Sequence, residues 1–407
     1  MKKSLFIIAA VGGSLLGFTS CSNDEIIAEN ESINDANVIS FRPLVSGNTR
    51  AVDQDVTALQ ASGNGFYVTA QHQTTSPYTY FDNVQFKWNS TNNTYNSDNK
   101  YYWPSANTLD FYAYAPATGA DIARTNYTTF VVTPNATPAS QEDFIYAVTK
   151  GKTKAGSTSG VALNFRHAES KIVIKLKNSN SGLKITVKDV AIVNVTNKAT
   201  FTWINSINSS LETADNTDGN NSAYYLNSTS WSAADGATTT SYSQTATTTD
   251  YISTTPETAL PADMILVPQT LTLNTVYAGS EQSTSTFNGA YISVKLKIQN
   301  SANPYAYIVG GDDDSAADAD NEGYVTAMWP LATVSSWLPG HKYTYTVELS
   351  GGGYFPKKHS NDGTTALDPI LAGAEIMFAS VTVDAWTTFE ENGNVYTGVT
   401  PSTPVVP

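Results

Sequence analysis

Apolar and polar residues alternate along much of this chain, and a two-residue period is typical of strands that bury one face. In "KIVIKLK", the side chains of Ile172, Ile174 and Leu176 share one face, and three lysines share the other. The same alternation recurs in three further segments, residues 183–188, 291–300 and 342–349. Helical spacing is hard to find, so we predict an all-β fold built from antiparallel sheets.

Two expectations concern the middle of the chain. Residues 171–177 and 183–188 are separated by a short polar loop, which predicts that they form a hairpin. Residues 205–250 are rich in Ser, Thr and Asn and carry few apolar anchors, which is typical of a long surface excursion.

The turn-forming residues divide the strands into two regions. The Lys- and Gly-containing stretch 150–160 has the composition of a linker or long loop, and we place a domain boundary near Leu163. A mature chain of about 350 residues is long enough for two cores. We therefore predict two tandem all-β domains, residues 51–163 and 164–389, followed by a C-terminal tail, residues 390–407.

The N-terminus has the features of an export signal. Lys2 and Lys3 precede the apolar stretch 5–16, which is too short for a bilayer core that needs roughly twenty residues. Small residues then lead into Cys21, the only cysteine of the chain, in the manner of a lipobox. We predict a signal peptide over 1–20 and lipidation of Cys21; an ordinary secretory signal with an incidental cysteine is the alternative.

The charge composition of the chain limits the kinds of molecule that it can bind. The chain carries 22 Lys and Arg against 36 Asp and Glu, a formal net charge of −14. Such a surface repels phosphate backbones, so we expect no nucleic-acid partner. With its one cysteine committed to lipid, the chain has no disulfide available, and burial and backbone pairing must hold the fold together.

Five segments together resemble the fimbrillin family, the type V pilins of Bacteroides-like bacteria. They are, in chain order, "VISFRPLVSGNTRA", "YYWPSANTLDFYAYAP", "ALNFRHAESKIVIKLK", "WLPGHKYTYTVEL" and "IMFASVTVDAWT". The resemblance implies two transthyretin-like β-sandwich domains and a cell-surface fimbria assembled from pilin subunits by strand exchange. It also implies an outer-membrane lipoprotein precursor whose N-terminal segment is removed by an Arg-specific protease. Asn23, Asp24 and Glu25 resemble the acidic signal that sends such lipoproteins to the surface.

The residues fit that mechanism. Ile39, Phe41 and Val45 fall on one face of a strand-like segment, with Ser40 and Arg42 opposite, as in a half-buried first strand. Arg50 follows a small polar turn where the backbone is exposed to proteases. Cleavage between Arg50 and Ala51 would release the lipidated propeptide, residues 21–50, and leave a groove with unpaired backbone groups that a neighbour's strand can fill.

The C-terminus holds the candidate donor. Ile376 and Phe378 have one parity and Val381 and Val383 the other, which predicts a bulge near Ala379 and Ser380. Beyond it, Val395, Thr397 and Val399 share one face before Pro401 stops regular pairing. Either stretch could be the donor strand that enters a neighbouring subunit, and we favour the last one. An extension past the last domain strand favours a stalk subunit over a tip adhesin.

The sequence offers little chemistry for catalysis, and we predict no enzymatic activity and no cofactor. The histidines are scattered at His72, His167, His341 and His359, and "GSTSG" has Thr158 where a nucleophile elbow needs serine. Asp312, Asp314, Asp318 and Asp320 form a weak calcium candidate within an acidic loop, although their spacing lacks EF-hand order and a solvated loop is the expected state.

A different function class is a monomeric surface lipoprotein that binds glycans, such as those of a host or bacterial surface. Trp88 and Trp103 lie in aromatic, Asn-rich surroundings, and exposed indole rings stack on sugars. Burial in a sandwich core is the more usual place for such residues. A pilin requires cleavage at Arg50, whereas the glycan binder stays solitary and anchored.

Overall fold

The computed structural model describes residues 37–44, 56–61, 63–91, 93–116, 119–203, 230–246, 250–251, 260–272, 289–302, 306–311, 323–331, 334–358, 365–371, 378–385, 388–391 and 394–397. The chain divides into two compact units, Met1–Asn37 and Val38–Pro407, and all elements below belong to the second. The fold is all-β, as predicted. In the described part, α1 (Val56–Gln60) is the one α-helix, and no helix there is long and apolar enough to span a membrane.

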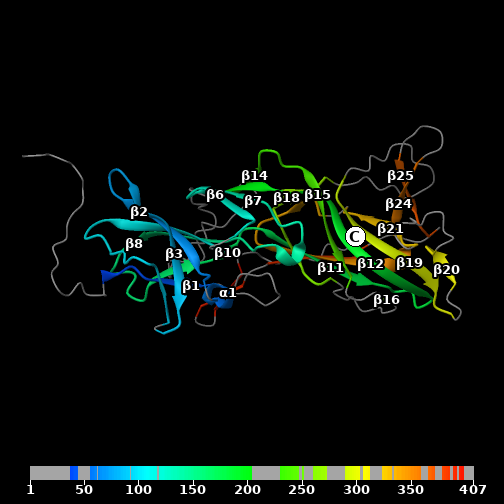
Figure 1. The fold of residues 1–407 in the computed structure, drawn as a ribbon, viewed down its shortest axis with the longest axis horizontal. Coiled ribbons are helices and arrows are strands. Elements are labelled where there is room, and N and C mark those ends of the chain that lie inside the picture. The colour runs from blue at the N-terminus through cyan, green and yellow to red at the C-terminus, as the bar shows by residue number, and fades with distance from the viewer. Residues whose placement is uncertain are drawn as a thin grey trace, which may run out of the picture. The chain divides into compact units, whose positions relative to one another are not determined.

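Nearest the N-terminus, a six-stranded antiparallel sheet has the order β10-β8-β5-β2-β3-β4 (Figure 1). Its strands are β2 (Phe66–Gln73), β3 (Tyr78–Asn89), β4 (Thr94–Asn96), β5 (Thr108–Ala115), β8 (Ile145–Lys152) and β10 (Arg166–His167). A parallel pair, β1 (Phe41–Leu44) and β9 (Val161–Asn164), adds its apolar side chains to the same core.

A second sheet covers the other face of β5. It has the order β14-β13-β7-β6 and consists of β6 (Ile122–Asn126), β7 (Thr129–Val132), β13 (Ala199–Thr202) and β14 (Trp231–Ala233). Phe111 of β5 lies in the core beneath β1, whereas Tyr112 packs with Phe130 and Phe201 of the covering sheet. Both faces of β5 are therefore buried. β7 and β13 pair although they lie on either side of Leu163 in the sequence. The domain boundary near Leu163 stays a prediction.

The C-terminal core lies between two further sheets. The four-stranded sheet has the order β17-β11-β23-β26, with β11 (Ser170–Lys177), β17 (Met264–Leu266), β23 (His341–Glu348) and β26 (Phe378–Ala385). The larger sheet contains β12 (Leu183–Thr196), β15 (Thr239–Thr245), β16 (Asp250–Tyr251), β19 (Tyr291–Asn300), β20 (Tyr307–Val309), β21 (Val325–Pro330), β24 (Tyr354–Lys358) and β25 (Thr365–Pro369). Ile292, Val294, Leu296 and Ile298 are buried in this core, as their alternation predicts.

The remaining elements are short. β18 (Gln269–Thr270) pairs with β22 (Ser336–Trp337), and β27 (Thr388–Glu391) pairs with β28 (Asn394–Thr397). Two 3₁₀ turns, η2 (Pro138–Ser140) and η6 (Leu349–Gly351), complete the described elements.

The predicted hairpin over residues 171–188 is wrong. β11 and β12 lie in different sheets, with β11 between β17 and β23 and β12 between β15 and β19. The connection is instead an arch fixed by polar groups: the amide of Asn178 donates to the carbonyl of Leu183 at 2.9 Å, and Glu348 accepts from the Ser179 backbone at 2.9 Å. Two strands of the same alternating pattern cannot reveal from sequence whether they pair with each other or face each other across a core.

Two further expectations need correction. The sheets are not wholly antiparallel, because β11 pairs with β23 and β1 pairs with β9 in parallel. The polar stretch 205–250 is also not a plain surface excursion where it is described. Trp231 in β14 and Tyr242 in β15 are buried, and each anchors its strand to a different core.

Candidate site at the N-terminal strand

Residues 38–44, which include β1, lie between two parts of the N-terminal region. The backbone N–H of Ile39 donates to the Tyr101 carbonyl at 2.7 Å, and the N–H of Val161 donates to the Ser40 carbonyl at 2.8 Å. On the first side Val38 forms an antiparallel bridge with Tyr102, and on the second side β1 runs parallel to β9 with Phe41 opposite Val161. Both backbone edges of this segment are thus used by neighbours distant in sequence.

Its side chains alternate as the sequence predicts. Ile39 and Phe41 are 3% and 5% exposed, whereas Ser40 and Arg42 are exposed. The ring of Phe41 meets Phe86, Phe111 and Phe66 edge to face, with centroids 4.7, 5.2 and 6.2 Å away. Such contacts add to the gain from area burial. Phe41 is therefore an anchor of the N-terminal core and not a surface residue.

A glycine lets β9 approach this segment. Gly160 has a φ of +87°, and a Cβ atom there would lie 3.2 Å from the Ser40 hydroxyl and 3.4 Å from the Ser40 carbonyl. A side chain would therefore be strained in conformation and tight in space. Gly160 was not singled out by sequence reasoning for this role, since its pairing partner was unknown.

A cavity of about 330 Å³ lies beside β1. Phe41 and Pro43 contribute to its wall from β1, and Trp88 and Tyr95 contribute from β3 and β4. Burial raises the pKa of the Tyr95 hydroxyl to about 12, so the group is neutral at physiological pH. The wall offers apolar surface and no charged group other than Arg42.

Several predicted site residues lie outside the described residues. They are Cys21, Val45, Arg50, Ala51, Val399, Asp312, Asp314, Asp318 and Asp320. The base of the acidic loop is described: the N–H of Gly311 donates to the Gly323 carbonyl at 2.8 Å. No group of three or more His, Cys, Asp or Glu side chains within the described ranges is placed to hold a metal, which leaves the loop itself untested.

The candidate donor segment is described only in its backbone. Val395 and Thr397 belong to β28, and they pair with Glu390 and Thr388 of β27. In the described part of the chain, this two-stranded sheet shares no strand with the others. The assignment of residues 390–407 as the donor stays a prediction.

The two tryptophans proposed for glycan stacking are partly buried against the N-terminal core. Trp88 packs on Tyr95 with ring centroids 5.0 Å apart, and Trp103 meets Phe111 edge to face at 5.9 Å. Their rings are used for packing, which favours the structural interpretation over a stacking platform.

The three described histidines are each held by hydrogen bonds within the fold. His167 is buried, and its Nδ1 atom lies 2.9 Å from Asp143. Beside this pair, Glu169 is fully buried and accepts from the Phe144 backbone at 3.0 Å. Burial raises the pKa of Glu169 well above its usual value, and the neighbouring acids, Asp143 first, raise it further. Sequence reasoning missed these carboxylates, because nothing in their spacing distinguishes them from exposed acids.

The other two described histidines lie in β2 and β23. His72 contacts the Tyr78 hydroxyl at 2.7 Å, and His341 contacts the Pro339 carbonyl at 2.8 Å. Burial lowers the pKa of His341. His359 lies outside the described residues.

The fold defines an all-β protein whose N-terminal core includes the buried first strand, β1, from before the predicted cleavage site. The profile of the fimbrillin-like family matches residues 49–368, and the chain belongs to that family. The family is one of structural proteins associated with fimbriae and the cell surface.

The chain is also similar to solved structures of two Bacteroides proteins. A fimbrial protein from Bacteroides vulgatus ATCC 8482 shares 13% identity with a TM-score of 0.49, covering 86% of this chain and 100% of its own. A candidate cell adhesion protein from Bacteroides uniformis ATCC 8492 shares 16% identity with a TM-score of 0.43, covering 87% and 100%. No curated protein matches the sequence.

Proposed function

We propose that this chain is a pilin subunit of a cell-surface fimbria that supports adhesion. It is exported as a lipoprotein through Cys21, cleaved between Arg50 and Ala51 by an Arg-specific protease, and polymerised by donor-strand exchange. Its partners are other pilin subunits, and the outer membrane holds it through lipid only before cleavage. Membership of the fimbrillin-like family supports the general role.

The observation that carries the cleavage step is the burial of the segment before Arg50. Ile39 and Phe41 fill the N-terminal core, yet they precede the proposed cut and would leave with the propeptide. Two side chains at about 1.5–3 kcal/mol each and two backbone hydrogen bonds at about 0.5–1.5 kcal/mol each correspond to roughly 4–9 kcal/mol of lost interactions. A strand that enters the vacated slot and restores these contacts is therefore strongly favoured.

A strand from another copy can restore what the propeptide supplied. The vacated slot would expose the edge of β9 and the Tyr101 carbonyl, and a donor needs apolar residues at alternate positions to fill the sites of Ile39 and Phe41. Val395, Thr397 and Val399 occupy alternate positions on one face, with the two valines on either side of a threonine that has a methyl group and a hydroxyl. Because donor and acceptor surfaces differ, the contact runs head to tail and leads to a filament.

Replacement of Arg50 tests the cleavage step. In cells that make the fimbria, Arg50→Ala should leave the propeptide attached and abolish the heat-labile oligomer ladder in surface extracts. Asn48→Ala is the matched control, because it alters the same turn and keeps the arginine. Polymers of Arg50→Ala as abundant as those of wild type would show that assembly does not depend on this cut.

A further inference from the structure

The crossover between β10 and β11, residues 168–169, is bonded to both the N-terminal and the C-terminal sheets. On the N-terminal side, the N–H of Ala168 donates to the Phe144 carbonyl at 2.8 Å, just before β8. On the C-terminal side, the carbonyl of Glu169 accepts from the Gly340 N–H at 2.8 Å, just before β23. One short segment therefore ties the start of a strand in each region.

The side chain of Glu169 is enclosed at this crossover. It is 0% exposed, and its Oε2 atom accepts from the Phe144 N–H at 3.0 Å. Its Oε1 atom is buried and has no hydrogen-bond partner in the described part of the structure. A carboxylate removed from water needs a cation or several donors, and a single backbone N–H does not replace them. The neutral, protonated carboxyl is the form that this site accommodates.

Three acids act on Glu169 from neighbouring segments. Glu142 and Asp143 precede β8, and Asp121 precedes β6. Burial raises the pKa of Glu169 most, and the charges of Asp143, Asp121 and Glu142 raise it further. Loss of the proton would therefore place a charge in a site that is both desolvated and already negative.

The other ionisable groups on the strands around Glu169 are not bonded to its free oxygen, Oε1. The ring of His167 lies 2.9 Å from Asp143, and the ammonium group of Lys171 lies 3.4 Å from Asp263. The groups concerned are Arg166 and His167 in β10, Lys171 in β11 and Tyr242 in β15.

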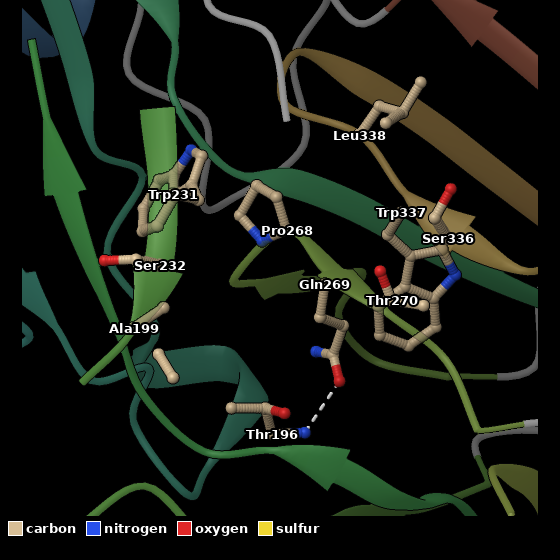
Figure 2. A pocket seen from close by; sticks show the side chains of 11 residues that line it. Thr196, Ala199, Trp231, Ser232, Pro268, Gln269, Thr270, Ser336, Trp337 and Leu338 are labelled. Atoms are coloured by element: carbon tan, nitrogen blue, oxygen red, sulfur yellow. Dashed lines mark hydrogen bonds between the residues drawn. The ribbon is translucent and has the colours of Figure 1, made fainter. Parts of the chain in front are cut away.

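The C-terminal side of the crossover has open space beside it. The hydroxyl of Ser170 donates to the Leu338 carbonyl at 2.9 Å. Leu338 in turn lies in the wall of a cavity of about 390 Å³, which is lined by residues of β13, β14, β18 and β22 (Figure 2). A shift of the chain at Leu338 into this space does not compress a close-packed core.

We propose that the crossover is a pH-dependent conformational switch with Glu169 as its proton-binding residue. While Glu169 is protonated, the crossover is closed and bonded to both regions. When Glu169 loses its proton to solvent, the crossover opens locally, the carboxylate reaches water, and both cores stay folded. The switch goes beyond the proposed pilin function and needs neither cleavage at Arg50 nor strand exchange, so each proposal can fail while the other holds.

Proton linkage sets the pH range of the opening. In the open crossover, an exposed Glu169 has its usual pKa of 4.5, whereas the pKa in the closed crossover is higher. The open form therefore binds fewer protons above pH 4.5. Its opening constant rises by up to about tenfold per pH unit from there towards the pKa of the closed form, and it is constant below pH 4.5.

Hydrogen exchange with mass spectrometry tests the switch in the purified chain lacking only its signal peptide. Exchange is measured at pH 5 and pH 7.5 and corrected for the intrinsic rate at each pH. We expect the opening constant of the crossover peptides, 142–146, 166–171 and 338–342, to rise at least about tenfold between the two pH values. A peptide over β19, residues 291–300, should stay more protected at both. Equal opening constants for β19 and the crossover at pH 7.5 would show global unfolding and overturn the proposal.

Glu169→Gln separates the effect of the proton from that of the fold. Glutamine keeps an acceptor for the Phe144 N–H and cannot ionise, so the opening constant of its crossover should be the same at both pH values. Asp98→Asn, at an exposed position, should behave as wild type does. The absence of a rise in wild type, or an equal rise in Glu169→Gln, would contradict the switch. The wild-type measurement decides by itself if the glutamine variant does not fold.

Discussion

Phe41 is the residue on which the N-terminal strand depends most. Its ring has three aromatic neighbours and is 5% exposed, so its removal leaves a void that the surrounding rings cannot fill by small shifts. We expect Phe41→Ala to lower the free energy of unfolding of the uncleaved chain by about 3–5 kcal/mol, measured by urea unfolding. Ser40→Ala, at the exposed neighbour, should change it by less than about 0.5 kcal/mol. Equal effects of the two variants would contradict the proposed packing.

Glu169 gives a prediction about pH. Its pKa in the folded chain is raised above the usual 4.5, so folding favours its protonated form. Stability is therefore unaffected well below pH 4.5, where the carboxyl is protonated in both states, and falls as pH rises from there towards the folded pKa. Glutamine keeps the acceptor for the Phe144 N–H and cannot ionise.

Glu169→Gln should thus melt a few degrees higher than wild type at pH 8 and within about one degree of it at pH 4. Asp98→Asn, at an exposed position, should show no such pH-dependent difference. Scanning calorimetry at both pH values checks the pair. A Glu169→Gln variant less stable than wild type at pH 8 would show that the buried carboxylate is charged and compensated.

At the scale of elements, alternation predicts which side chains are buried but not which strands pair. The faces of residues 291–300 and the buried tyrosines of 343–347 follow from the sequence, and so does the bulge at Ala379. There the partners shift from Thr346–Ser380 to Val347–Phe378, and Ala379 is left unpaired. That bulge was visible because it inverts the parity of the apolar residues on either side.

Other features of the fold cannot be predicted from any single stretch of the sequence. The arch between β11 and β12, the parallel pairing of β1 with β9 and the shared sheet of β7 and β13 each depend on segments distant in sequence. For the candidate site, the inward faces of Ile39 and Phe41 were predictable, whereas the pairing of Ile39 with Tyr101 was not.

For the whole molecule, the account depends on one claim: an N-terminal segment that completes a core in the precursor is replaced by a strand from another copy. The position to observe this replacement is Ala162, which lies opposite Arg42 in the register of β1 and β9. A photoreactive benzophenone amino acid there contacts whatever strand occupies the slot. Mass spectrometry of the crosslinked peptides identifies that strand.

In the uncleaved precursor, we predict crosslinks from position 162 to residues 38–44 of the same chain. In assembled fimbriae, we predict that these are replaced by crosslinks to a peptide from residues 390–407 of a neighbouring subunit. Crosslinks in the fimbriae that still reach residues 38–44 would show that the first strand never leaves, and the proposed assembly would then be wrong.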